Sequence, residues 1–374
     1  MNLSLEFGNI ILIVGIVWLL AVFIQLFYYL FFYLRIVQKP HTTPTHTPPV
    51  SVIICARNEE ENLKQYLPSI LNQNYPQYEV IVVNDASEDN SAWVLDAFAK
   101  QYSHLKISTI KKDEKFNHSK KLAVTIGIKA ASYEYLLFTD ADCEACSSDW
   151  IKQMVQSYKP DTEIVLGYGG YIKTKGLLNK LIRFDSLFIA MQYMGFAKAG
   201  IPYMGVGRNL SYKKTLFFNN KGFANHASLQ SGDDDLFVNE TANKQNTEIN
   251  TTAHTRSKAK KSFALWLIQK KRHQTTFHRY KKHHQFLLIL EPISRALFYS
   301  LIPALLILDI NTYPIVLSLF ILRLIILVLT YYFFTKTLKE QDLLLFSPLY
   351  DILYLFIDLI VKLSRNPHQQ NKWK

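Results

Sequence analysis

Residues 135–143, YLLFTDADC, determine the predicted fold of this chain. Five residues with strand character lead directly into Asp140 and Asp142, which are separated by one small residue. In open α/β sheets, ligands bind at the carboxyl edge of the strands, and this is where the two acids would lie. Paired carboxylates suit Mg²⁺ or Mn²⁺ that also binds phosphate oxygens. We therefore expect a metal-bound diphosphate here, held by Asp140 and Asp142.

Three similar units precede this stretch. Short apolar runs at residues 50–55, 80–83 and 105–110 predict strands, and each is followed by a segment with helical spacing, such as residues 59–72 and 120–131. Strands that alternate with helices predict an α/β fold with a mostly parallel sheet and right-handed crossovers. Asp85, which ends the second strand, should then share one edge with Asp140 and Asp142.

The chain after residue 149 is less regular. Residues 164–172 resemble a strand with a glycine-rich middle, where the backbone passes close to another group. Residues 177–197 are apolar around most of a helix, which favours a buried core helix over one in a membrane interface. Residues 231–236, SGDDDL, place three acids at the start of a probable helix, where at least one of them can cap it.

The apolar content of 49% in 374 residues is concentrated in four segments. Residues 10–34 carry no charge and are long enough for a transmembrane helix. Further apolar stretches lie between residues 286 and 363. We therefore expect a linker at 35–49, a soluble domain at 50–275, and a C-terminal membrane region at 286–363.

The formal net charge is +12, and its distribution indicates membrane orientation. Residues 251–285 hold ten Lys or Arg and no acid, directly before the second apolar stretch. Positive residues beside spans face the cytoplasm, so we expect a multi-pass protein of the cell membrane with a cytoplasmic domain. The position beside the membrane favours membrane lipids or a phosphorylated ligand as partners and argues against nucleic acid.

Residues 343–363 can be interpreted in two ways. They are apolar enough to span, but they include Pro348, Asp351 and Asp358, and the basic tail prefers the cytoplasm. We therefore expect two spans in the C-terminal region plus either a third span or an interfacial or re-entrant helix.

Charged residues inside the apolar stretches predict ion pairs. Glu291 and Arg295 are four residues apart and could pair on one helix face. Arg323, inside the third stretch, needs a partner, for which Glu291 and Asp309 are the candidates.

The three cysteines, Cys55, Cys143 and Cys146, lie in the predicted cytoplasmic portion. A reducing compartment keeps them as thiols. No second cysteine pair accompanies Cys143 and Cys146, so a structural zinc site is not expected.

Taken together, these motifs resemble the membrane-bound family 2 glycosyltransferases, which carry a nucleotide-diphosphosugar transferase domain of GT-A type. The resemblance covers about residues 50–275 and rests on seven motifs in the family's order: VSVIICARNEEENL, VVNDASEDNS, SKKLAVTIGI, FTDADC, GVGRNLSYKK, SGDDDLF and Gln269-Lys270-Lys271-Arg272-His273.

The resemblance implies roles for particular residues. Asp85 matches the aspartate that binds the nucleotide base, with Ala56 and Glu59 packing on that base, and Lys120 or Lys121 matches a basic position near the nucleotide. Asp140 and Asp142 match the metal and diphosphate motif, which implies Mg²⁺ or Mn²⁺. Asp234, or its neighbour Asp233 or Asp235, matches the catalytic base. Gln269 and Arg272 match the motif over the acceptor and pyrophosphate.

Two departures qualify the resemblance. Asn84 replaces an aspartate often found before Asp85, and His273 stands where processive polysaccharide synthases have Trp. The expected function is inverting, metal-dependent transfer of a sugar from a nucleotide donor, UDP-linked by family preference, to a lipid or lipid-linked acceptor. A processive polysaccharide synthase and a non-catalytic, membrane-anchored binding protein are the alternatives.

Overall fold

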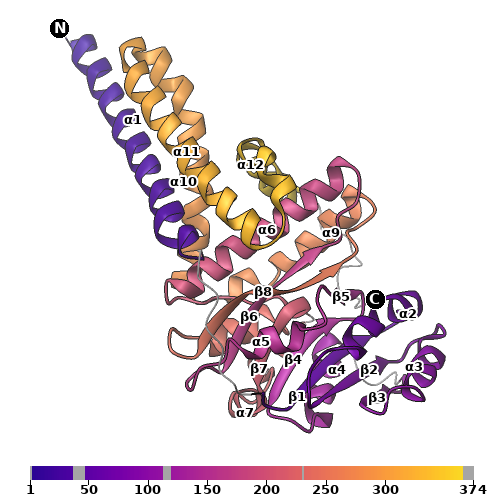
Figure 1. Ribbon diagram of the computed structural model, residues 1–374. Coiled ribbons are helices and arrows are strands. Elements are labelled where there is room, and N and C mark those ends of the chain that lie inside the picture. Colours follow the sequence, from indigo (N-terminus) through magenta and orange to yellow (C-terminus); the bar gives the residue numbers. More distant parts are fainter. Residues whose placement is uncertain (1, 37–46, 113–118, 230, 365–374) are drawn as a thin grey trace. The chain divides into compact units, whose positions relative to one another are not determined.

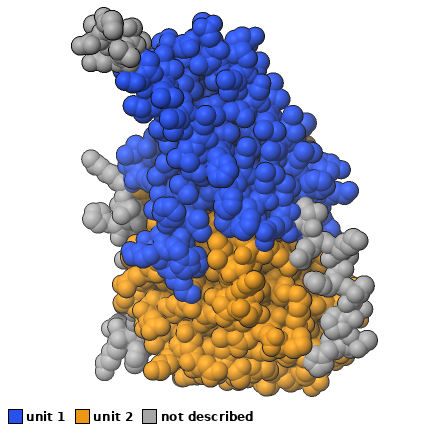
Figure 2. All heavy atoms as spheres, turned by 90° about the vertical axis from the view of Figure 1, so that its left-hand side faces the viewer, with its two compact units in different colours: residues 1–38, 281–364 blue, residues 39–280, 365–374 orange. Residues whose placement is uncertain are grey.

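The computed structural model describes residues 2–36, 47–112, 119–229 and 231–364 (Figure 1). The chain forms two compact units, which Figure 2 distinguishes by colour. One unit combines residues 1–38 with 281–364, and the other consists of residues 39–280 and 365–374. Residues 37–46 of the predicted linker lie outside the described residues.

An eight-stranded mixed sheet organises the second unit. Its strands are β1 (Val50–Ala56), β2 (Tyr78–Asp85), β3 (Leu105–Ile110), β4 (Tyr135–Asp140), β5 (Cys143–Ala145), β6 (Ile164–Tyr171), β7 (Leu210–Lys213) and β8 (Thr247–Ser257). Their spatial order is β3-β2-β1-β4-β7-β6-β8-β5. The pairs β3–β2, β2–β1, β1–β4 and β6–β8 are parallel, whereas β7 runs antiparallel to β4 and β6, and β5 runs antiparallel to β8. The predicted α/β fold with a mostly parallel sheet is confirmed.

Helices connect these strands (Figure 1). They are α2 (Glu60–Leu71), α3 (Ser91–Ala99), α4 (Lys120–Ala130), α5 (Trp150–Val155), α6 (Leu177–Lys198), α7 (Lys214–Asn219), α8 (Asp235–Thr241) and α9 (Phe263–Gln274). Most of α6 is buried and the helix packs against β6 and β8, which agrees with the prediction of a core helix.

The sequence of the central strands explains their place in the sheet. Strand β1 is buried along its whole length, and its one polar residue, Ser51, bonds to Glu79 of β2 at 2.6 Å. Helix α4 lies directly on these strands, because a Cβ on Gly127 would come within 2.6 Å of the Ile53 side chain. The glycine thus permits a close helix–sheet contact.

The register of β1 determines which residues share the carboxyl edge of the sheet. Cys55 is paired with Asp140 of β4, and Ala56 is paired with Asn84 of β2. Asp85 and Asp140 therefore flank the end of β1 on neighbouring strands, as the predicted topology required.

Four apolar helical segments form the first unit. Helix α1 (Asn2–Phe27) continues through a π-helical turn (Tyr28–Tyr33) and a 3-10 turn (Leu34–Ile36). It is accompanied by α10 (Lys282–Leu308), α11 (Tyr313–Thr337) and α12 (Ser347–Leu363), and a 3-10 segment (Gln341–Phe346) leads into α12. All four segments are long and apolar enough to cross a membrane.

A buried polar network joins these four helices. Gln25 of α1 accepts a hydrogen bond from Arg323 Nη2 at 2.6 Å, and Arg323 Nη1 bonds to Asp351 of α12 at 2.7 Å. Glu291 and Arg295 of α10 form the predicted ion pair. The expected partners of Arg323 were wrong: within the described residues its ion pair is with Asp351, because α12 folds back against α10 and α11.

Candidate active site

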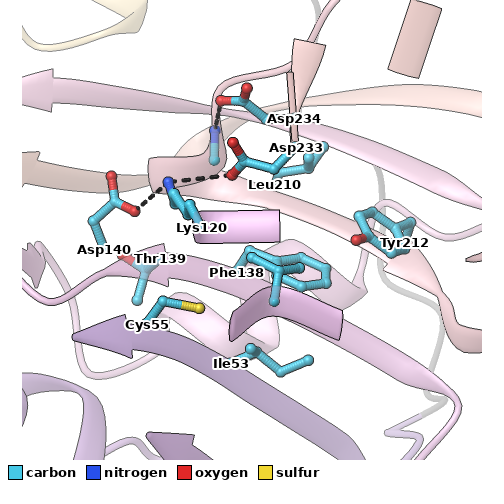
Figure 3. Close-up of a pocket in the computed structure, with 12 residues that line it drawn as sticks. Ile53, Cys55, Lys120, Phe138, Thr139, Asp140, Leu210, Tyr212, Asp233 and Asp234 are labelled. Carbon is cyan, nitrogen blue, oxygen red and sulfur yellow. Dashed lines mark hydrogen bonds and ion pairs between the residues drawn. The ribbon is translucent and has the colours of Figure 1, made fainter. Parts of the chain in front are cut away.

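A pocket lies at the carboxyl edge of the sheet in the unit formed by residues 39–280 (Figure 3). Strands β1, β4 and β7, helix α4 and the segment before α8 contribute to it. Its lining residues are Ile53, Cys55, Lys120, Val124, Phe138, Thr139, Asp140, Gly207, Leu210, Tyr212, Asp233 and Asp234. The pocket thus combines an apolar floor with three carboxylates and one ammonium group.

Lys120 bridges two of these carboxylates. Its Nζ lies 2.9 Å from Asp140 Oδ1 and 3.3 Å from Asp233 Oδ2 (Figure 3). Ser119 caps α4 by accepting a bond from the Leu122 N–H, so Lys120 projects from the first turn of the helix. Burial alone would lower the pKa of Lys120, but the attraction of Asp140 and Asp233 outweighs it and raises that pKa well above its ordinary value.

Lys121 points elsewhere. Its Nζ donates to the carbonyl oxygens of His226 at 2.6 Å and Leu229 at 3.0 Å. Burial lowers the pKa of Lys121. The sequence did not distinguish Lys120 from Lys121 as the basic residue near the nucleotide. In the structure Lys120 lines the pocket, whereas Lys121 binds backbone carbonyls of the segment before α8.

Asp140 remains ionised in this setting. Burial would raise its pKa, but Lys120, Arg208 and Arg272 together hold the pKa of that carboxyl below its usual value. A negative carboxylate is the form that can bind a cation.

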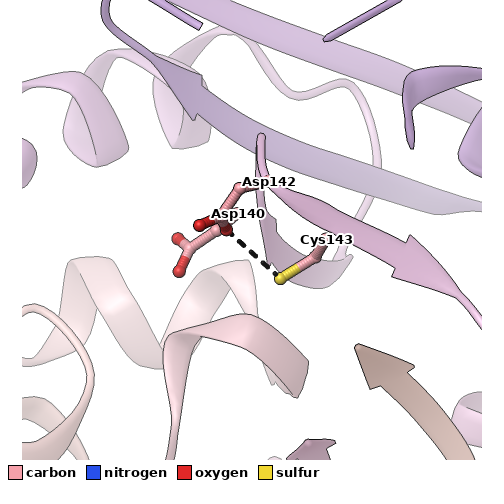
Figure 4. Close-up of side chains that lie close together, drawn as sticks. All are labelled: Asp140, Asp142 and Cys143. Carbon is pink, nitrogen blue, oxygen red and sulfur yellow. Dashed lines mark hydrogen bonds between the residues drawn. The ribbon is translucent and has the colours of Figure 1, made fainter. Parts of the chain in front are cut away.

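Asp140 and Asp142 come together with Cys143 at the end of β4 (Figure 4). One ligand atom from each of the three lies within 4.8 Å of the others. Burial raises the pKa of the Cys143 thiol well above its ordinary value, and Asp142 and Asp140 raise it further. Cys143 therefore stays a neutral thiol, and the two carboxylates provide the hard oxygen ligands that fit Mg²⁺ or Mn²⁺.

The three acids before α8 have different surroundings. Asp233 faces Lys120, and Asp234 Oδ2 accepts a hydrogen bond from the backbone N–H of Gly207 at 2.6 Å. Asp235 is buried and accepts hydrogen bonds from Thr276, from Tyr280 at 2.8 Å and from the Leu236 N–H. The structure thus brings Asp233 and Asp234 to the pocket and holds Asp235 within the core.

Asp234 has the protonation behaviour of a base that works near neutral pH. Burial raises its pKa to about 7, with further contributions from the negative charges of Asp233 and Asp235. Lys120 and the Gly207 N–H act in the opposite direction. A carboxylate with a pKa near the working pH is well suited to accept a proton.

The loops after β1 and β2 join beside Asp85. Arg57 Nη1 lies 3.9 Å from Asp85 Oδ2. The Asn58 N–H donates to Ser87 Oγ at 3.0 Å, and the Glu59 N–H donates to Ser91 Oγ at 3.0 Å. Asp85 and Ala56 are buried at the strand ends, and Glu59 accepts a bond from Asn62 at the start of α2. Hydrogen bonds thus connect the loop after β1 with the loop after β2 at the carboxyl edge of the sheet.

The Gln269 and Arg272 motif lies on α9. Gln269 Nε2 donates to the Tyr171 hydroxyl at 3.3 Å. Arg272 is exposed, and its charge contributes to the lowered pKa of Asp140. Helix α9 therefore carries a charge that acts on Asp140.

Two residues of the GVGRN motif reach the site although the sequence analysis assigned them no role. Gly207 binds Asp234 through its backbone, and Arg208 acts on Asp140 through its charge. The signal for Arg208 was the glycine-rich strand β6, because a Cβ on Gly169 would lie 2.8 Å from Arg208 Cβ. All three cysteines are free, as expected.

Comparison with known sequences identifies relatives for part of the chain. Residues 51–218 match the family model "Glycosyl transferase family 2". The poly-beta-1,6-N-acetyl-D-glucosamine synthase of Staphylococcus epidermidis is 32% identical over 115 residues, which are 31% of this chain and 26% of that protein. An uncharacterized glycosyltransferase of Haemophilus influenzae is 32% identical over 126 residues, which are 34% of this chain and 37% of that protein. The chain thus matches between 26% and 37% of the length of these two relatives.

A solved structure extends the likeness of fold to most of the chain. The mannosyltransferase PcManGT from Pyrobaculum calidifontis, in complex with GDP-Man and Mn²⁺, has a TM-score of 0.57 and 19% sequence identity. The match covers 93% of this chain and 99% of the other. The likeness of fold therefore covers both the sheet domain and the four apolar helical segments.

Proposed function

Because residues 51–218 form a glycosyltransferase family 2 domain, we propose that this protein transfers a sugar from a nucleotide-diphosphosugar, with inversion, to an acceptor at the membrane. One observation carries the proposal. Asp140, next to the paired acid Asp142, and Asp234, with its pKa near 7, line the same pocket. Direct displacement of a nucleoside diphosphate by an acceptor hydroxyl needs a group that binds the diphosphate and a base that takes the hydroxyl proton, both within one cavity.

The donor end lies along the edge that Asp85 and Asp140 share. Asp85, Ala56 and Glu59 would hold the nucleotide base, and Lys120 would balance negative charge between the two ends of the pocket. A UDP-linked donor follows from the family preference. Asp140 and Asp142 would hold Mg²⁺ or Mn²⁺, which when bound would neutralise charge on the diphosphate.

The acceptor end lies at Asp234. The carboxylate would take the proton from the acceptor hydroxyl as that oxygen attacks the anomeric carbon. Asp233 is held by Lys120, and Asp235 is occupied by Thr276 and Tyr280, so Asp234 is the strongest candidate for the base. Gln269 and Arg272 would cover the acceptor and pyrophosphate.

The membrane unit supports a lipid or lipid-linked acceptor. Its four apolar segments would keep the catalytic unit beside a bilayer, where such an acceptor is concentrated. The basic residues at 251–285 would place the catalytic unit on the cytoplasmic side.

The test uses the full chain purified in detergent and a panel of nucleotide sugars with Mg²⁺ or Mn²⁺. We expect metal-dependent release of a nucleoside diphosphate from one donor, and a loss of about 10²–10⁴-fold in kcat for Asp234→Asn. Asp161→Asn, at an exposed acid outside the pocket, is the matched control and should retain activity. Full activity of Asp234→Asn would exclude it as the base, and no hydrolysis or transfer with any donor would exclude the function.

A processive polysaccharide synthase is the second candidate. The partial similarity to poly-beta-1,6-N-acetyl-D-glucosamine synthase favours it, whereas His273 in place of Trp disfavours it. The length of the product distinguishes the two functions, since a single transfer adds one sugar to the acceptor and a processive synthase adds many.

A further inference from the structure

Arg208 is held rigidly beside the candidate diphosphate site. Its Nη1 donates to the Gly170 carbonyl at 3.2 Å and to Ser257 Oγ at 3.1 Å. The guanidinium lies over the Tyr171 ring, 4.2 Å from its centroid. The Arg208 carbonyl also accepts a bond from Thr255 Oγ1 at 2.7 Å, so both backbone and side chain are fixed.

Strand β6 is shaped to admit this arginine. A Cβ on Gly169 would lie 2.8 Å from Arg208 Cβ, closer than real Cβ contacts. Gly167 has the same relation to Asn209, since its Cβ would lie 2.6 Å from the amide of that side chain. The glycines of β6 therefore make room for the GVGRN segment.

The fold brings Arg208 next to the acidic pair. The 3-10 turn that carries Arg208, Gly207–Asn209, packs against β4, the strand that ends in Asp140. Gly207, the residue before Arg208, lines the pocket together with Lys120 and Asp140. Both side-chain hydrogen bonds use Nη1, so among the described residues Nε and Nη2 are left to donate to a ligand. A fixed guanidinium with donors available is well suited to phosphate oxygens.

We propose that Arg208 binds the diphosphate of the donor and stabilises the charge that it gains during transfer. In that step the acceptor oxygen forms a bond to the anomeric carbon, the bond from that carbon to the diphosphate oxygen breaks, and its electron pair stays on the diphosphate. The proton of the acceptor hydroxyl goes to Asp234. This inference rests on the proposed function and adds a fixed arginine to the site, in addition to the exposed Arg272.

Tyr171 links this arginine to the acceptor motif. Its ring stacks on Arg208, and its hydroxyl accepts the hydrogen bond from Gln269. Tyr171 is thus a positioning residue through which α9 and the diphosphate site support one another.

The experiment measures binding of UDP, UMP, GDP and GMP to the detergent-purified full chain in the presence of Mn²⁺. The wild type should bind one diphosphate more tightly than its monophosphate. Arg208→Met should weaken binding of that diphosphate by about 10-fold or more, as expected for a charged hydrogen bond, and change monophosphate binding less than about twofold. Arg208→Lys should fall between the two.

Two further variants separate position from charge. Gly169→Ala leaves the guanidinium in the chain but displaces it, so it should reproduce the selective loss of diphosphate binding and provides the test if Arg208→Met does not fold. Arg256→Met is the control, because Arg256 is next to Ser257 on β8 and alternation directs it to the opposite face.

The outcomes distinguish this inference from the proposed function. Selective loss in Arg208→Met and Gly169→Ala, with Arg256→Met unchanged, supports the assignment. A wild type that binds and transfers, with the same diphosphate preference in Arg208→Met and Gly169→Ala, overturns the role of Arg208 alone. A wild type that binds none of the four nucleotides overturns the proposed function and this inference with it.

Discussion

The backbone N–H of Gly207 donates to Oδ2 of Asp234 at 2.6 Å, and the N–H of Asp235 donates to Oδ1 of the same carboxylate at 2.8 Å. Each oxygen of Asp234 is therefore oriented by one backbone donor. These bonds favour the ionised form, but burial and the neighbouring acids outweigh them and the pKa remains near 7. Orientation and proton affinity are thus set by different groups.

The pH dependence of activity should report this balance. A base must be ionised, so kcat/KM should fall as the pH is lowered through about 7. Lys120→Met removes a charge that lowers the pKa of Asp234, and the acidic limb should move to higher pH. Lys129→Met, at an exposed lysine of α4, is the control for the pH profile. An acidic limb that stays in place in Lys120→Met would contradict this account.

Asp234→Asn should stabilise the protein at alkaline pH. Folding raises the pKa of this acid, so the folded state favours its protonated form. The stability that depends on this proton is fully present below about pH 4 and is lost as the pH rises through about 7. Removing the charge should therefore raise the free energy of unfolding at pH 8 by roughly 2 kcal/mol, a value reduced for the screening of this partly exposed carboxylate by water. Thermal unfolding of both proteins at pH 5.5 and pH 8 checks this, and a gain that does not grow with pH would be inconsistent with it.

The adjacent lysines of α4 should have opposite phenotypes. Lys121→Met removes two bonds to the carbonyls of His226 and Leu229 and should lower the melting temperature, with a cost of about 1.5–3 kcal/mol. Lys120→Met leaves that loop intact and should instead change metal-dependent activity. Melting curves and Mn²⁺ titrations of the two variants test this. Equal effects in both measurements would show that the residues share one role.

Removing one partner of the buried ion pair between Arg323 and Asp351 should destabilise the protein more than replacing both partners by apolar residues. Arg323→Met removes the closer ion-pair partner of the buried Asp351 and leaves it the pair with Arg295 at 3.4 Å. The variant should therefore destabilise the helical unit by roughly 2–3 kcal/mol, less than the full cost of an unpaired buried charge. The double variant Arg323→Met/Asp351→Leu should recover much of this loss. Lys362→Met, in an exposed pair on α12, is the control with little effect. Additive losses in the double variant would exclude coupling between the two residues.

The sequence predicted the part of the fold that depends on local pattern. Strands β1, β2 and β4 are apolar runs that end in polar turns, and this pattern was enough to place Asp85 and Asp140 at one edge. Strand β8 was not predicted, because TEINTTAHTRS is polar and becomes a strand through pairing with β6 and β5.

Choices between neighbouring residues also needed the structure. Lys120 and Lys121, like Asp234 and Asp235, are adjacent in sequence, and only packing decides which of them faces the pocket. Arg323 was assigned to Glu291 or Asp309 because they are the nearest acids in the neighbouring segments. Its partner, Asp351, lies on a helix whose return to the bundle has no signal in local spacing.

The network of the membrane helices has a consequence for biosynthesis. Gln25 is separated from Arg323 by 298 positions, and Arg323 is separated from Asp351 by 28. A ribosome releases the first helix long before its polar partners exist, whereas the strands around the pocket are complete by residue 257. The catalytic unit can therefore fold during translation, while the membrane helices assemble only when the last of them has emerged.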